Sequence, residues 1–326
     1  MTAYFDIFNG DADGICALQQ LRLAAPRPQA ELITGVKRDI ELVGRLLSAT
    51  PAAELAGAEI TVLDISLERN RPALATLPPS CRLFYADHHY AGEIPAGPNR
   101  EFHIDPDSQQ CTALIVDRLL AGRYRAWAVV GAFGDNLHDP ARRAAAELGL
   151  AGGELEELRE LGELLNYNGY GQQLADLHFP PATLYRELAP YPEPLAFCRR
   201  SAAMADLRRG FAADLGRARE LTPLRDDAVG RVYQLPPRPW ARRVNGVFAN
   251  ELARSAPDRA HALLVEGDDD HFLVSVRAPW QRPSGADTLC RRFPGGGGRA
   301  AAAGINGLPA AQIPAFLAAF SEIFQP

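Results

Sequence analysis

The sequence is poor in the residues that stabilise small secreted domains or bind structural zinc. It contains five cysteines in 326 residues, none of them in a Cys-x-x-Cys pair or in a cysteine–histidine cluster with zinc spacing. An odd number of scattered cysteines argues against a disulfide framework. We therefore expect free thiols and a reducing, cytoplasmic environment.

Long apolar runs and an excess of basic charge are also missing. No stretch approaches the roughly 18–20 apolar residues of a membrane span, and the N-terminus reaches Asp6 without the basic and apolar segments of a signal peptide. The formal net charge of -6 argues against a long basic face for non-specific duplex binding. We expect no membrane partner. Binding of a small anionic substrate remains compatible with this charge.

Apolar residues are plentiful, at 47% of the chain, which is enough for more than one domain. In residues 1–150, short apolar runs alternate with amphipathic stretches, a pattern typical of βα units and a parallel sheet. The predicted strands are 4–8, 31–34, 59–63, 82–85 and 101–104. The predicted helices are 15–25, 39–49, 110–121 and 126–133.

The rest of the chain predicts a connector and a second domain. Residues 151–220 carry two exposed helical patterns, at 154–165 and 203–220. In residues 221–326 we predict strands at 231–234, 244–248, 261–265 and 272–276, followed by a helix at 309–324. The predicted fold class is α/β, with a parallel-sheet N-terminal domain (1–150), a helical connector (151–220), a smaller α/β domain (221–326) and an active-site cleft between the two domains.

Acidic and histidine side chains follow three of the predicted strands and one apolar helix. The carboxyl ends of parallel strands meet at one edge of a sheet, where such folds bind ligands. Each segment alone also fits an ordinary turn or helix cap, but four together favour one site. Its members would be Asp11, Asp13, Asp64, Asp87, His88, His89 and Asp135.

Carboxylates this close would repel one another unless divalent cations neutralised them. The sequence therefore predicts a metal centre. Oxygen and imidazole ligands without thiolate favour manganese, with magnesium as the alternative. The imidazole ligands also leave zinc, iron or cobalt possible as the bound ion.

In their order along the chain, the motifs D-x-D-G, D, D-H-H and G-D-N resemble those of the DHH phosphoesterase superfamily. That superfamily includes RecJ-like exonucleases, oligoribonuclease and cyclic-dinucleotide phosphodiesterases, manganese pyrophosphatases and exopolyphosphatases. The resemblance implies that Asp11 helps hold one metal ion, that Asp13 and His88 hold the other, that Asp64 bridges them and that Asp135 completes the second site.

The resemblance also assigns residues around the metal ions. It implies that His89 faces the substrate phosphate and that Asp87 orients the histidines from behind. Many members carry a histidine two or four positions before the first aspartate, where this sequence has Asn9 and Ile7. We expect Asn9 beside the metal ligands rather than among them, and either one or two metal ions per chain.

A glycine-rich run, PGGGGRAAAAG at 294–304, lies inside the second predicted domain. Glycine backbone N–H groups can form a nest for an anion, and an arginine adds a donor fork; a flexible linker is the alternative. The run resembles the G-G-G-H-x-x-A-A-G signature of the DHH-associated domain, with arginine replacing histidine, and the upstream VSVR resembles its S-x-R element. The resemblance implies a substrate grip made of Gly296, Gly297, Gly298, Arg299 and Arg277, the two arginines also acting on the reacting phosphoryl group.

A further segment, NYNGYG at 166–171, fits either base stacking or a simple turn. We expect metal-dependent hydrolysis of phosphodiester bonds in a small nucleotidic substrate, such as a dinucleotide or a short single-stranded oligonucleotide. The alternatives are a phosphoanhydride hydrolase acting on polyphosphate or pyrophosphate, and a non-hydrolytic protein that binds a nucleotide or phosphate. The substrate and the oligomeric state stay open.

Overall fold

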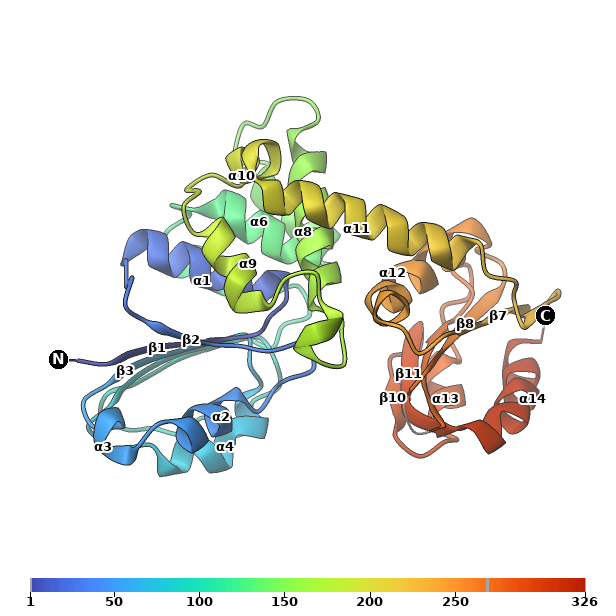
Figure 1. Ribbon diagram of the computed structural model, residues 1–326, viewed down its shortest axis with the longest axis horizontal. Coiled ribbons are helices and arrows are strands. Elements are labelled where there is room, and N and C mark those ends of the chain that lie inside the picture. The colour runs from blue at the N-terminus through green and yellow to red at the C-terminus, as the bar shows by residue number, and fades with distance from the viewer. Residues whose placement is uncertain (1, 268–269, 326) are drawn as a thin grey trace. The chain divides into compact units, whose positions relative to one another are not determined.

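The structure is a computed structural model that describes residues 2–267 and 270–325 (Figure 1). The chain folds into two compact units, Met1–Arg209 and Gly210–Pro326. Helix α11 (Ala202–Arg219) runs from the first unit into the second. None of the helices in the described part of the chain is both long and apolar enough to cross a bilayer.

The first unit is built on a parallel sheet of five strands in the order β2-β1-β3-β4-β5. The apolar residues of β1, β3 and β4 are mostly buried on both faces, as expected for a sheet covered by helices on both sides. The predicted strands are present, with ends that differ by no more than two residues. The strands are β1 (Tyr4–Phe8), β2 (Glu31–Ile33), β3 (Glu59–Leu63), β4 (Arg82–Asp87) and β5 (Arg100–Ile104).

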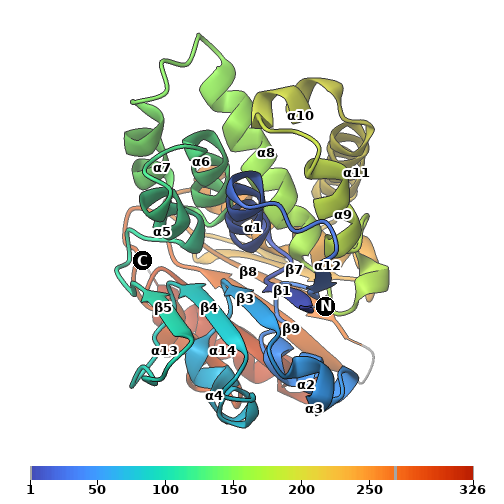
Figure 2. The ribbon, with the colours of Figure 1, turned by 90° about the vertical axis from the view of Figure 1, so that its left-hand side faces the viewer.

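Helices cover both faces of this sheet (Figure 2). One face carries α2 (Leu42–Ala49), α3 (Ala52–Leu55) and α4 (Leu67–Thr76). The other face carries α1 (Ala12–Ala24), α5 (Thr112–Leu119) and α6 (Arg125–Gly134), which pack on one another. The remaining helices of the unit are α7 (His138–Ala145), α8 (Glu154–Gly169), the 3-10 helix η1 (Leu174–Asp176), α9 (Pro181–Leu188) and α10 (Pro194–Arg200).

Helix α8 lies in the predicted connector but packs closely on α6. A Cβ atom added to Gly162 would lie 2.3 Å from the carbonyl oxygen of Val130 and 2.8 Å from the backbone nitrogen of Gly134. Glycine is therefore required for these helices to approach one another. Most of the predicted connector belongs to the first compact unit, and the three-domain division stays a prediction.

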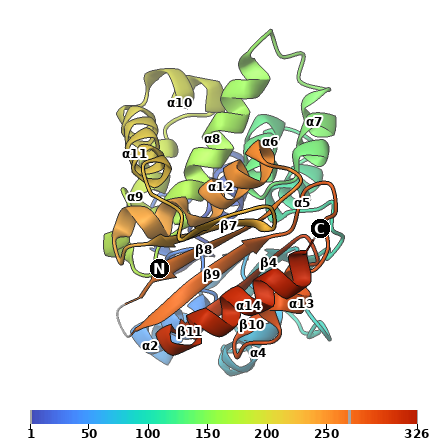
Figure 3. The same ribbon diagram turned by 90° about the vertical axis from the view of Figure 1, so that its right-hand side faces the viewer.

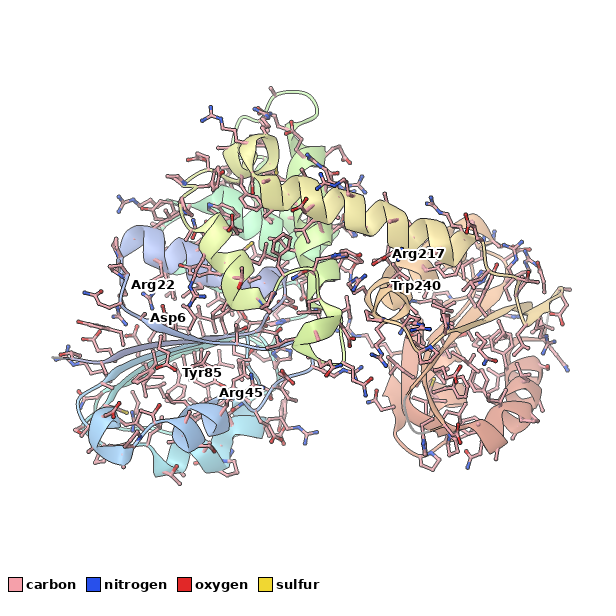
Figure 4. All side chains as sticks on the ribbon, viewed as in Figure 1. Asp6, Arg22, Arg45, Tyr85, Arg217 and Trp240 are labelled. Carbon is pink, nitrogen blue, oxygen red and sulfur yellow. The ribbon has the colours of Figure 1, made fainter. Side chains whose placement is uncertain are left out.

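A buried ion pair fixes α1 on the sheet (Figure 4). Nε of Arg22 donates to Oδ2 of Asp6 at 2.7 Å, and its Nη2 donates to the hydroxyl of Thr61 at 2.8 Å. Asp6 is 1% exposed, so the pair is largely shielded from water. Arg22 lies in the last turn of α1, and its anchoring holds the helix whose first turn contains the acidic motif.

The second unit has a mixed sheet in the order β10-β11-β9-β8-β7-β6, in which only β7 and β8 pair in parallel among the described strands. Helix α12 (Pro239–Ser255) covers one face, and α13 (Ala286–Cys290) and α14 (Ile313–Phe324) cover the other (Figure 3). The strands are β6 (Arg225–Asp226), β7 (Gly230–Leu235), β8 (Ala260–Glu266), β9 (His271–Arg277), β10 (Gly296–Gly298) and β11 (Ala302–Pro309). A second 3-10 helix, η2 (Ala310–Gln312), precedes α14.

The predicted strand at 244–248 is wrong, because these residues lie in the middle of α12. Val244 and Phe248 are four positions apart, and Ala241 and Leu252 extend the same buried face at helical spacing. The other predicted strands of this unit are present.

Candidate metal centre

The D-x-D-G motif forms the N-cap and first residues of α1, shortly after β1. Oδ1 of Asp11 caps α1 by accepting the backbone N–H groups of Asp13 (3.0 Å) and Gly14 (3.2 Å). A Cβ atom on Gly14 would lie 2.3 Å from the carbonyl oxygen of Asn9, so this position requires glycine. The motif therefore places two carboxylates at the carboxyl end of β1.

Asp13 is 1% exposed and points at the N-terminus of α5. Its two carboxylate oxygens accept the backbone N–H groups of Thr112 and Ala113, each at 2.7 Å. A helix N-terminus stabilises a negative charge. Each oxygen has a second lone pair for another partner.

Asp64 follows β3 in a left-handed backbone conformation, with φ of 57°. Its N–H donates to the carbonyl of Ala86 at 3.0 Å, and its Oδ1 accepts the hydroxyl of Thr112 at 3.4 Å. A non-glycine residue in this conformation is strained, and such residues cluster at functional sites. The strained backbone directs a 2% exposed carboxylate into the acidic cluster.

The D-H-H motif stands at the end of β4. Asp87 is fully buried, and its Oδ1 lies 2.7 Å from Nδ1 of His89. That contact orients His89, whose side chain is 45% exposed. Nε2 of His88 lies 3.4 Å from Oδ1 of Asp64, 3.8 Å from Oδ2 of Asp135 and 4.0 Å from Oδ2 of Asp13.

These distances assemble four of the predicted residues around one point. Asp135 follows α6, Asp13 lies in the first turn of α1, Asp64 follows β3 and His88 follows β4. The structure therefore brings these four residues together, and their role as metal ligands stays a prediction. We call Asp13, Asp64, His88 and Asp135 the His88 side of the cluster.

The crowding of carboxylates shifts the pKa values of His88, Asp64 and Asp135. Burial lowers the pKa of His88, but the carboxylates of Asp64, Asp13 and Asp135 outweigh it and raise that pKa to about 10. Burial and the charges of Asp11 and Asp13 raise the pKa of Asp64 well above its ordinary value. Burial is also the main cause that raises the pKa of Asp135 to about 6, against Lys37 and His88. The His88 side is thus a site that stabilises added positive charge.

The sequence interpretation missed Lys37, which lies in the loop after β2. Its Nζ is 2.5 Å from Oδ2 of Asp11, 2.9 Å from Oδ1 of Asn166 and 3.9 Å from Oδ1 of Asp135. Burial alone would lower the pKa of Lys37, but Asp11 and other neighbouring groups raise it well above the ordinary value. Lys37 also holds the pKa of Asp11 below its ordinary value, despite burial. We call Asn9, Asp11, Lys37 and Asn166 the Lys37 side.

Asn9 contributes to this side through its amide. Its Oδ1 accepts the N–H of Asp11 and its Nδ2 donates to the carbonyl of Lys37, each at 3.3 Å. The signal for Lys37 was topological: β2 pairs with β1 in parallel, so the loop after β2 meets the D-x-D-G turn at the same edge of the sheet.

The His88 side fits a divalent cation. Ligand atoms of Asp64, His88 and His89 lie within 4.8 Å of one another, and Asp13 and Asp135 add carboxylates within 4.0 Å of the His88 ring nitrogen. Oxygen and imidazole donors without thiolate suit manganese or magnesium. Oδ2 of Asp87 is buried without a hydrogen-bond partner among the described residues, which adds to the uncompensated negative charge.

The predicted substrate grip lies in the second unit. The three glycines form β10, paired antiparallel with β11, and Arg299 stands in the turn that follows, where its N–H donates to the carbonyl of Ala302 at 2.9 Å. Arg277 ends β9 directly opposite Ala302, and its Nε donates to Asn250 at 2.7 Å. The glycines thus form a hairpin strand rather than a linker or a loop leading into a helix, and both arginines lie at one end of the sheet.

Comparisons with known proteins support the fold. No protein-family model and no curated protein matches the sequence. A solved DHH-domain protein, described as a member of the S1p family of ribosomal proteins, aligns with a TM-score of 0.67 and 14% identity over 98% of this chain and 86% of its own. Exonuclease RecJ bound to manganese aligns with a TM-score of 0.63 and 18% identity, over 98% of this chain and 89% of its own. A pGpG-specific phosphodiesterase from Vibrio cholerae aligns with a TM-score of 0.52 and 10% identity, over 98% of each chain.

The predicted α/β architecture is therefore confirmed, and the chain shares its fold with these DHH-domain and RecJ structures. The similarity extends over nearly the whole chain, so it includes both compact units. At these identities the comparison shows the fold alone. The chemistry of this chain has to be argued from its own residues.

Proposed function

We propose that the protein is a metal-dependent phosphoesterase that hydrolyses phosphodiester bonds. The observation that carries this proposal is the position of His88, whose Nε2 faces three carboxylates from three different elements within 4.0 Å. In this proposal Asp13, Asp64, His88 and Asp135 hold a divalent cation, with manganese as the first choice. The cation would polarise the phosphoryl group and lower the pKa of an attacking water.

Side chains in each of the two units would bind phosphate oxygens of the substrate. Asp87 holds His89 at 2.7 Å, so the half-exposed His89 ring has a fixed orientation in which it would face a phosphoryl oxygen. In the second unit, Arg277 and Arg299 would bind anionic oxygens through their guanidinium groups, and the β10 glycines would leave room for a phosphate. Charge developing on the phosphoryl oxygens would be stabilised by these donors.

We propose a small nucleotidic substrate, a dinucleotide or short single-stranded oligonucleotide. Two structural neighbours are described as an exonuclease and as a pGpG-specific phosphodiesterase. The net charge of -6 favours a short substrate over a long polymer. We place the activity in the cytoplasm, where the five buried free cysteines would stay reduced.

A second candidate is hydrolysis of phosphoanhydrides. It is favoured by a neighbour from Bacteroides fragilis described as exopolyphosphatase-related, with a TM-score of 0.50 and 15% identity. The same metal centre would serve either reaction, because both transfer a phosphoryl group to water.

A substrate series with manganese supplied tests the proposal. We expect cleavage of 5′-labelled dinucleotides to be fastest, with rates that fall as the oligonucleotide lengthens, and slow release of phosphate from polyphosphate. Faster polyphosphate hydrolysis would favour the second candidate. Bound manganese without turnover of any phosphoester or phosphoanhydride would favour a non-hydrolytic protein that binds a nucleotide or phosphate.

A further inference from the structure

Lys37 lies among oxygen atoms that would otherwise suit a metal ion. Its ammonium nitrogen is 2.5 Å from Asp11, 2.9 Å from Asn166 and 3.9 Å from Asp135. These three acceptors come from the N-cap of α1, from α8 and from the end of α6. The ring centroid of Tyr170 is 5.5 Å from the same nitrogen. Carboxylates, an amide oxygen and an aromatic face all favour a cation at this point.

The loop that carries Lys37 is held from two directions. The N–H of Lys37 donates to the carbonyl of Gly169 at 2.9 Å, and its carbonyl accepts Nδ2 of Asn9 at 3.3 Å. The lysine side chain is 28% exposed, so most of its stem is packed. The ammonium group is thus placed by the fold and is not a mobile surface charge that happens to reach Asp11.

Asn9 supports Lys37, and both polar atoms of its side chain already take part in hydrogen bonds. Its Oδ1 is used by the N–H of Asp11, and its Nδ2 is used by the loop of Lys37. Asp11 is similarly committed, with Oδ1 capping α1 and Oδ2 bound to the ammonium group. A divalent ion at Asp11 would have to displace this ion pair or sit beside a fixed positive charge.

We propose that the Lys37 ammonium group takes the place of one of two metal ions, so that the chain binds a single divalent cation on the His88 side. This inference rests on the proposed metal centre. Asp135 lies between the two sides, with Oδ1 3.9 Å from Nζ of Lys37 and Oδ2 3.8 Å from Nε2 of His88. The covalently attached charge neutralises Asp11 at all times, whereas the metal ion on the His88 side binds reversibly.

The test is a count of bound manganese that does not depend on turnover. Full-length protein is stripped with a chelator, dialysed against excess manganese and analysed for metal and protein. We expect one manganese ion per chain for the wild type and for Lys37→Arg, which keeps the charge. We expect two for Lys37→Met, which keeps a long side chain without the charge.

Electron paramagnetic resonance of the wild type gives a readout that needs no variant. A single ion gives the spectrum of isolated manganese, whereas two neighbouring ions give a spin-coupled spectrum. Two ions per wild-type chain, or one ion in a folded Lys37→Met variant, would overturn the inference and leave the proposed function standing. No bound manganese in the wild type would instead overturn the metal centre on which both rest.

Discussion

The two sides of the acidic cluster balance their negative charge in different ways. On the Lys37 side, Asp11 already has an ammonium partner at 2.5 Å, and its pKa is held below the ordinary value. On the His88 side, the pKa values of Asp64, Asp135 and His88 are all raised. The first pattern is that of a completed ion pair and the second is that of a site short of positive charge. A metal ion is therefore expected on one side only.

Removing a carboxylate from the His88 side should have the largest effect. We expect Asp64→Asn to lower kcat/KM by on the order of 10³-fold, because this residue faces His88 and would bind the metal ion. It should also weaken manganese binding, because the variant loses one of the carboxylates that would hold the cation. Manganese affinity and kcat/KM on a chromogenic phosphodiester check both points.

The matched control is Asp139→Asn, which changes an exposed carboxylate at the start of α7 whose side chain is 80% accessible. It should leave activity and manganese affinity unchanged. Equal losses in the two variants would contradict the assignment of Asp64.

The titration of His88 gives the second largest effect, on stability without metal. The folded-state pKa of about 10 exceeds the unfolded value of about 6.5. The stabilising contribution is therefore fully present below about pH 6.5 and is lost as the pH rises to about 10. We expect the free energy of unfolding in a chelator to fall by about 4 kcal/mol across this range.

Urea unfolding of the wild type and His88→Gln at several pH values measures this difference. The variant should keep only the part of the pH dependence that other groups cause. Saturating manganese should remove the decline in the wild type, because the bound ion replaces the proton. Identical pH dependence in the two proteins would show that His88 is not protonated in this site.

Asn9→His tests why no metal ion is expected on the Lys37 side. Either a histidine ligand is missing there, or the Lys37 ammonium group already occupies the site. If the absence of histidine alone prevented metal binding on the Lys37 side, the variant would bind a second manganese ion. We expect one ion, because Lys37 is still present, and a loss of about 1–2 kcal/mol in the free energy of unfolding from the broken Asn9 hydrogen bonds. The double variant Asn9→His/Lys37→Met should bind two ions, more tightly than Lys37→Met alone.

The contrast between the two sides also separates what the sequence could predict from what it could not. Asp13, Asp64 and His88 were predicted to meet because parallel strands end at one edge of a sheet, and this needs only the order of strands and motifs. Lys37 belongs to no motif, and its contact with Asn166 joins positions 129 residues apart. That contact depends on how α8 packs, which periodicity does not determine.

The second unit shows a different limit. The run at 244–248 fits a strand and a helix equally well, and only the buried face continued by Ala241 and Leu252 identifies α12. The glycine run gave no sign of a hairpin, because glycine has little intrinsic preference for a strand. Pairing of β10 with β11 comes from the surrounding sheet instead.

A substitution in the second unit should have the smallest effect on activity. It should not change metal binding on the Lys37 side or the His88 side of the acidic cluster. We expect Arg299→Gln to raise KM by about tenfold, the loss of one charged contact to phosphate, with manganese affinity unchanged. Arg291→Gln is the matched control, since Arg291 is 65% exposed and pairs with Asp287 on the same helix. An unchanged KM would remove Arg299 from the substrate site, whereas altered manganese affinity would show that Arg299 affects the metal centre as well as the phosphate.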